Sequence, residues 1–124
     1  MALADPAVVT IGGTPHSLTR VKQDGYNSEY RLVSATDQYV LNVRNTSYLD
    51  KKRGVTINRH NIDISQTIFP VAPATLSTVR HCYVVIENQQ GDTLTDPNNF
   101  AAGILTFLTA SSGANITKVL NFES

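Results

Sequence analysis

The adjacent residues His81 and Cys82 are of the types that form a catalytic nucleophile and its base. They lie in the alternating segment Thr78–Glu87, which is typical of a strand, and successive strand side chains point to opposite faces. A dyad is therefore not expected. Cys82 is the single cysteine, so it cannot form an intrachain disulfide, and we expect it to be a buried small hydrophobe.

The remaining chemistry of enzymes is missing from the sequence. His16 and His60 have no second ligand at metal spacing, which predicts surface or partly buried histidines. The chain has no phosphate-binding glycine loop, no paired-cysteine zinc pattern and no glycine-flanked serine. We therefore expect no enzyme activity, no metal and no cofactor.

A group of cations in the middle of the chain is the stronger signal. Residues 44–60 contain five basic residues, Arg44, Lys51, Lys52, Arg53 and Arg59, against one acidic residue. With Tyr83 and nearby asparagines, these cations could neutralise phosphates, stack on bases and donate hydrogen bonds to base edges. The alternative is an ordinary solvated polar face, which composition alone favours.

Alternation and turn residues predict the strands that carry these groups. Glycines at positions 12 and 13 indicate a tight turn, and hence an N-terminal hairpin. Pro70 and Pro73 end the longest predicted strand. The expected strands are Val8–Ile11, His16–Lys22, Tyr26–Ser34, Gln38–Thr46, Val55–Phe69 and Thr78–Glu87.

The C-terminal part is predicted to form two helices. Thr95 or Asp96 could cap the first, with Pro97 at its first position. Its apolar residues recur at helical spacing and are expected to pack against another surface: Phe100, Ala101, Ile104, Leu105 and Leu108. Residues 111–113 break this helix, and residues 114–122 form a short second element. The expected fold is therefore α+β, an antiparallel sheet with an N-terminal hairpin followed by two C-terminal helices.

Length and composition fit one domain, residues 1–124, with the hairpin at about 7–22, strands at about 26–87 and the helical tail at about 96–122. The chain is 41% hydrophobic but only 16% charged. Low charge is consistent with surface hidden between subunits, and equally with a charge-poor monomer. No leader or membrane-spanning segment is expected. A sheet with one bare face and an open edge predicts association.

In the order and spacing of these segments the chain resembles the coat proteins of the single-stranded RNA bacteriophages, the levivirus-like group. The resemblance covers nearly the whole chain. It rests on the N-terminal hairpin, on Tyr39–Ser47 followed by a basic loop and a strand, on Arg80–Glu87, and on the C-terminal helical pair.

The resemblance implies an interlocked homodimer with a ten-stranded sheet, in which the helices of each chain cross the partner's sheet. Dimers would then form an icosahedral shell around the single-stranded RNA genome, in the virion and, during assembly, in the host cytoplasm. The loop between the last two strands, expected at Asn88–Thr95, would line symmetry axes. The resemblance also implies an RNA hairpin bound as a translational repressor.

The implied RNA-binding residues alternate on the middle strands and include residues that the alternation had already placed on one side. They are Val40, Asn42, Arg44, Thr46, Arg59, Asn61, Asp63, Tyr83, Val85 and Glu87, with Lys51, Lys52 and Arg53 in a basic loop. Asp63 departs from the family pattern, since an acid would repel phosphate unless it were paired, with Arg59 as the expected partner.

Two alternatives stay open at this point. A non-viral RNA-binding module of sheet and helices would use the same cations without forming a shell, although the chain lacks a compact aromatic stacking motif. An enzyme or ligand pocket would require the helix to cover the sheet within one chain, with polar groups converging inside the fold.

Overall fold

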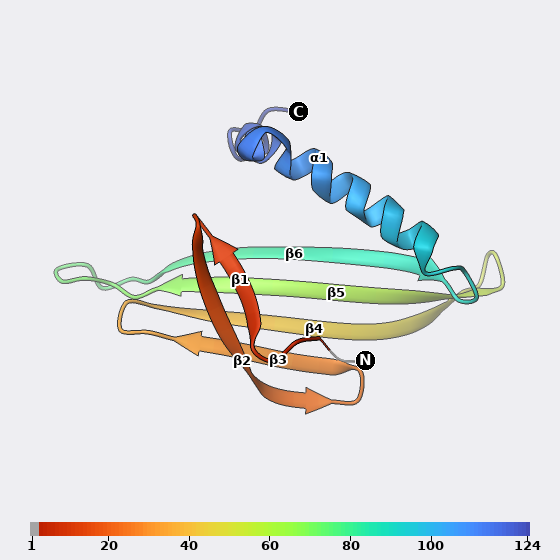
Figure 1. Cartoon of the computed structure of the whole chain (residues 1–124), viewed down its shortest axis with the longest axis horizontal. Coiled ribbons are helices and arrows are strands. Elements are labelled where there is room, and N and C mark those ends of the chain that lie inside the picture. Colours follow the sequence, from red (N-terminus) through yellow and green to blue (C-terminus); the bar gives the residue numbers. More distant parts are fainter. Residues whose placement is uncertain (1–2) are drawn as a thin grey trace.

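The computed structural model describes residues 3–124 as six antiparallel strands and one helix (Figure 1). The strands pair in chain order, so each strand lies between its neighbours in sequence. They are β1 (Ala7–Ile11), β2 (Thr14–Asp24), β3 (Asn27–Val33), β4 (Asp37–Asp50), β5 (Val55–Ile68) and β6 (Thr78–Gln89), and the helix is α1 (Thr95–Leu120). No helix in this range is long and apolar enough to cross a membrane.

Strand β2 joins the N-terminal segment to the rest of the sheet. Its first half, up to Leu18, pairs with β1, and its second half, from Thr19, pairs with β3. The register shifts between Arg20 and Lys22, and a shift of this kind bends a strand. Figure 1 shows β1 and the start of β2 crossing over the longer strands. β1 and the first half of β2 pair around the predicted turn at Gly12 and Gly13, but the expected fold is corrected, because β2 continues into one six-stranded sheet.

The core lies where this crossing segment covers β3 and β4. Leu18 and Tyr30 are fully buried. They pack with one side of β4, which contributes Tyr39, Leu41 and Val43. Because strand side chains alternate, the same side of β5 and β6 carries apolar residues. We call this side of the sheet the apolar face.

The prediction of two C-terminal helices is corrected to one continuous element, α1, but the predicted break at residues 111–113 is confirmed. The backbone of α1 leaves helical angles from Ala110 to Gly113. Three consecutive residues from Ser111 have positive φ, so the helix is sharply kinked there. The Asn115 side-chain amide donates to the Phe107 carbonyl oxygen at 2.8 Å, which ties the two sides of the break together.

The start of α1 also differs from the expectation. Its N-cap residue is Leu94, whose side chain makes no hydrogen bond to the first turn of the helix. Thr93 supplies the cap, since its hydroxyl accepts from the Asp96 backbone N–H at 3.2 Å and donates to the Asp96 carboxylate at 3.0 Å.

Two further expectations about connections are corrected by the topology. One chain forms a six-stranded sheet, whereas the expected ten-stranded sheet would take five strands from each chain, so the expected strand count is wrong. The last two strands, β5 and β6, are joined by residues 69–77, whereas most of the predicted loop Asn88–Thr95 connects β6 to α1. The last predicted strand already ended at Glu87, so residues 88–95 could lead only to the helix.

Candidate nucleic-acid interface

The sheet brings the ten predicted RNA-binding residues onto one face, opposite the apolar face. Residues directly opposite each other in an antiparallel pair share a face. In the register of β4 with β5, Asn42 lies opposite Asp63, and in that of β5 with β6, Asp63 lies opposite Tyr83. The remaining pairs are Val40 with Ser65, Arg44 with Asn61, Thr46 with Arg59, Asn61 with Val85 and Arg59 with Glu87. We call this side the polar face.

Both predicted cations of the polar face are held by acids on neighbouring strands. Arg44 Nη1 donates to Asp63 Oδ2 at 3.0 Å, and His81 Nε2 lies 3.4 Å from Asp63 Oδ1. Arg59 Nη1 donates to Glu87 Oε1 at 3.3 Å. The expected partnership of Asp63 with Arg59 is therefore wrong. The centre of the face consists of two cross-strand ion pairs with no net charge.

Asp63 is ionised at neutral pH in this arrangement. Partial burial of its carboxyl raises the pKa, but hydrogen bonds from Arg44 and His81 outweigh that effect and hold the pKa below its usual value. The Asp63 side chain is only 16% exposed, whereas that of Arg44 is 50% exposed. A ligand approaching the face therefore meets the guanidinium before the carboxylate.

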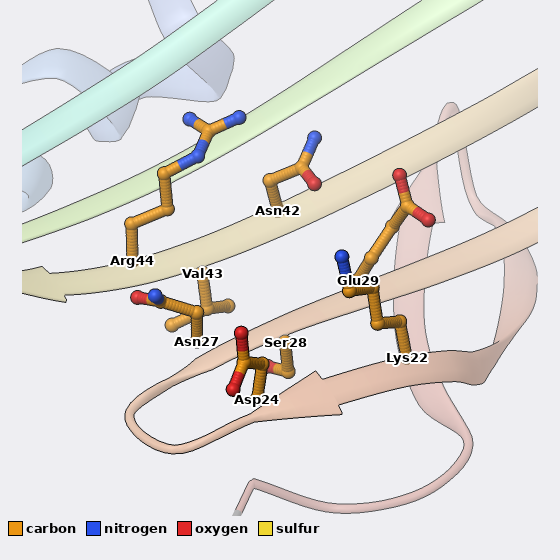
Figure 2. Close-up of a pocket in the computed structure, with 8 residues that line it drawn as sticks. All are labelled: Lys22, Asp24, Asn27, Ser28, Glu29, Asn42, Val43 and Arg44. Carbon is orange, nitrogen blue, oxygen red and sulfur yellow. The ribbon is translucent and has the colours of Figure 1, made fainter.

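A hollow of about 280 Å³ lies beside Arg44 on the side of β2 and β3 (Figure 2). Lys22, Glu29 and Asn42 stand in register across β2, β3 and β4. In Figure 2, Asn42 and Arg44 project from β4 in the same direction. The hollow is lined by Lys22, Asp24, Asn27, Ser28, Glu29, Asn42, Val43 and Arg44. The sequence prediction missed the members from β2 and β3, although the alternation of Glu29 and Arg31 with Tyr30 and Leu32 could have indicated them.

The predicted basic loop lies apart from this centre. Residues 51–54 form the turn between β4 and β5, at one end of the sheet (Figure 1). Arg53 Nε donates to Asp50 Oδ2 at 2.9 Å, and Lys51 and Lys52 are exposed. The loop is therefore a separate cationic feature.

The predicted packing residues of α1 have no packing partner large enough to bury them. The helix runs outward past the β6 edge (Figure 1), and none of its residues is buried. Ala101 and Leu108 are half-buried, and Leu105 is 39% exposed. Phe100, Ile104 and Phe107 form an open stripe, with 83%, 52% and 58% of their surface exposed.

The sequence predicted that Cys82 is buried and that His16 and His60 lie at the surface or are partly buried. Cys82 is exposed in the structure, so the expectation of a buried residue is wrong. It lies on the apolar face, opposite Ile64, where α1 does not cover the sheet. His16 packs against Tyr39, with ring centroids 4.6 Å apart.

His60 is partly buried on the apolar face between two asparagines. Its Nδ1 lies 2.7 Å from Asn45 Oδ1, and its Nε2 lies 2.9 Å from Asn88 Oδ1. The Asn45 amide nitrogen donates to the Tyr26 carbonyl oxygen, so its oxygen must accept from the imidazole. Within residues 3–124, no group of three or more histidine, cysteine or acidic residues could hold a metal ion.

A comparison with protein families matches residues 4–89, which include all six strands and end where β6 ends. The matched family consists of phage coat proteins, so the sheet belongs to a structural protein of the virion and not to an enzyme. It is the family of the coat protein of phage phiCb5, and because the match spans more than half of the chain, this chain belongs to it. No curated protein matches the chain.

Proposed function

We propose that this chain is the coat protein of a single-stranded RNA bacteriophage of the levivirus-like group. It associates as a homodimer, and the dimers assemble in the host cytoplasm into an icosahedral shell around the RNA genome. The polar face is the side that meets RNA, and it also binds an RNA hairpin as a translational repressor.

The amount of exposed surface is the observation that supports association most strongly. The chain has an accessible surface of 9297 Å². A compact monomer of 13.5 kDa is expected to expose about 6,500 Å². The excess is about 2,800 Å² per chain, or about 5,600 Å² for two chains, which is at the upper end of the total area that obligate homodimers bury.

The chemistry of that surface favours a second copy as the partner. The open stripe of α1 and the exposed Cys82 present apolar surface that the chain's own core does not cover. Edge strand β6 pairs only with β5, so one row of its backbone groups is free among the described residues. Self-association would pair this edge and cover the apolar residues together.

The polar face supports RNA as its ligand. It combines the guanidinium groups of Arg44 and Arg59 with the amide of Asn42 and with Tyr83, which is 62% exposed. These groups offer phosphate contacts, base-edge hydrogen bonds and a stacking surface on adjoining strands. A non-viral RNA-binding module, the alternative from sequence, is disfavoured by membership in a coat protein family.

The test is electron microscopy of the recombinant chain after gel filtration, with ultraviolet absorbance measured on the same fractions. Uniform spheres that contain nuclease-protected RNA are the expected result. A small dimer without nucleic acid, under conditions where the chain is folded, would refute packaging. A mobility-shift titration with phage RNA hairpins tests the repressor role separately.

A further inference from the structure

The two cations at the centre of the polar face are each paired with a carboxylate, which weakens their attraction for phosphates. We propose that Asp63 is a specificity-determining residue, which holds Arg44 in an ion pair and so makes the face discriminate against RNA that offers only its phosphates. This inference rests on the proposed function, because it concerns RNA binding by the same face.

The geometry around Asp63 supports this role. Its two carboxylate oxygens are engaged from opposite sides, one by Arg44 of β4 at 3.0 Å and the other by His81 of β6 at 3.4 Å. Because Asp63 is nearly covered and Arg44 is half-exposed, a phosphate can reach the guanidinium only beside a fixed negative charge. The carboxylate therefore reduces the attraction that an unpaired arginine would exert.

Glu87 repeats this arrangement beside Arg59. Its Oε1 accepts from Arg59 at 3.3 Å, and its Oε2 accepts from the Tyr48 hydroxyl at 2.9 Å. Both central cations are thus compensated across strands. Phosphate contacts supply most non-specific RNA affinity, so a face built this way depends on neutral groups such as Asn42 and Tyr83, which contact bases.

A face of this kind should prefer single strands, whose bases are accessible, to duplexes, whose bases are hidden. Rejecting wrong ligands by reduced attraction is a recognised route to specificity, since specificity is a difference between two affinities. The expected cost is weaker binding to every RNA.

The experiment measures the affinity of the full-length protein for a 20-nucleotide RNA of mixed sequence, single-stranded and annealed to its complement, at several salt concentrations. Asp63→Asn should bind both RNAs more tightly and lose part of the preference for the single strand. One freed cation should steepen the slope of log K against log salt by about 0.7 for single strands. The ratio of the affinity of Asp63→Asn to that of the parent protein should therefore rise roughly threefold when the salt concentration is lowered from 200 to 50 mM.

Two control variants isolate the ion pair. Asp92→Asn makes the same change in net charge in the loop before α1, where Asp92 Oδ1 accepts from the Thr93 backbone N–H, and it should leave the slope unchanged. In the double variant Arg44→Gln/Asp63→Asn, the slope should return to that of the parent protein, because the freed cation is gone.

An unchanged slope and preference in Asp63→Asn, or the same shift in Asp92→Asn, would overturn the inference even if RNA-filled shells form. If the parent protein neither assembles nor binds either RNA, the proposed function fails instead. Should Asp63→Asn not fold, Glu87→Gln tests the same reasoning by freeing Arg59, and an unaltered slope there would refute it.

Discussion

The open stripe of α1 allows a direct test of self-association, through the single substitution Phe107→Ala. Phe107 is 58% exposed in the chain and is the last residue of the stripe, three positions after the exposed Ile104. Alanine is the best helix former, so the change removes apolar surface without weakening α1.

The expected magnitude follows from the exposed area. A phenylalanine side chain can bury roughly 200 Å², so the open fraction of Phe107 corresponds to about 120 Å². At about 25 cal/mol per Å² this area is worth about 3 kcal/mol when a partner covers it. A symmetric dimer loses the contribution twice, about 6 kcal/mol, which is an upper value and corresponds to a roughly 10⁴-fold weaker dimer.

Sedimentation velocity over a dilution series measures the dimer dissociation constant. Thr106→Ala, at the neighbouring exposed position of α1, is the control and should leave the constant within a few-fold of that of the parent. If Phe107→Ala dimerises as tightly as the parent protein, the stripe is not the dimer surface and the reasoning from exposed area is wrong.

Three further predictions concern the fold itself. Leu18→Ala should lower the free energy of unfolding by about 2–5 kcal/mol in urea, because Leu18 is fully buried, while Val21→Ala, 53% exposed, should change it by less than about 0.5 kcal/mol; equal effects would contradict the assigned core. The pKa of Asp63 is lowered in the fold, so its ion pair stabilises the protein above the unfolded value of 3.8 and this stabilisation is lost as the pH falls below it. Acid titrations of stability should therefore show a smaller loss below about pH 4 for Asp63→Asn than for the parent, and identical curves would argue against the pair. Gly113→Ala places a side chain at φ +81° and should cost about 1–2 kcal/mol in thermal unfolding, whereas Gly103→Ala, with open space around it, should stabilise α1 by up to about 1 kcal/mol. A neutral Gly113→Ala would show that the break in α1 is not required.

Much of the polar face could be predicted from sequence because it depends on a single rule. Side chains in a strand alternate, so the regular run from Tyr39 to Thr46 assigns each residue to one of two sides without any knowledge of its neighbours. The predicted bounds were close for the same reason: β5 was expected at Val55–Phe69 and extends over Val55–Ile68. The predicted β4 was too short, since it continues through Tyr48 to Asp50.

The partner of Asp63 could not be found in the same way. Alternation shows which side a residue faces, but not which residue of the next strand lies beside it, since that depends on register. The register of β4 with β5 is set by the four-residue turn after Asp50, and it puts Asp63 next to Arg44. Arg59 is nearer in sequence, but the register of β5 with β6 puts it beside Glu87.

The placement of α1 was beyond sequence analysis for a different reason. The spacing of Phe100, Ile104 and Leu108 predicts an apolar helix face but not the surface that this face contacts. The sequence did predict the break, since Ser111–Gly113 interrupt the periodicity, but it did not indicate the direction in which three left-handed residues send the chain.

The small size of the core has a consequence for how the protein reaches its fold. Within residues 3–124, only six hydrophobic side chains are buried: Leu18, Tyr30, Tyr39, Leu41, Val43 and Ile57. If a second copy supplies the missing contacts, folding and association are one bimolecular reaction. The concentration of newly made chains then sets both the melting temperature and the rate at which native protein accumulates, so nascent chains remain open to proteases until expression is high.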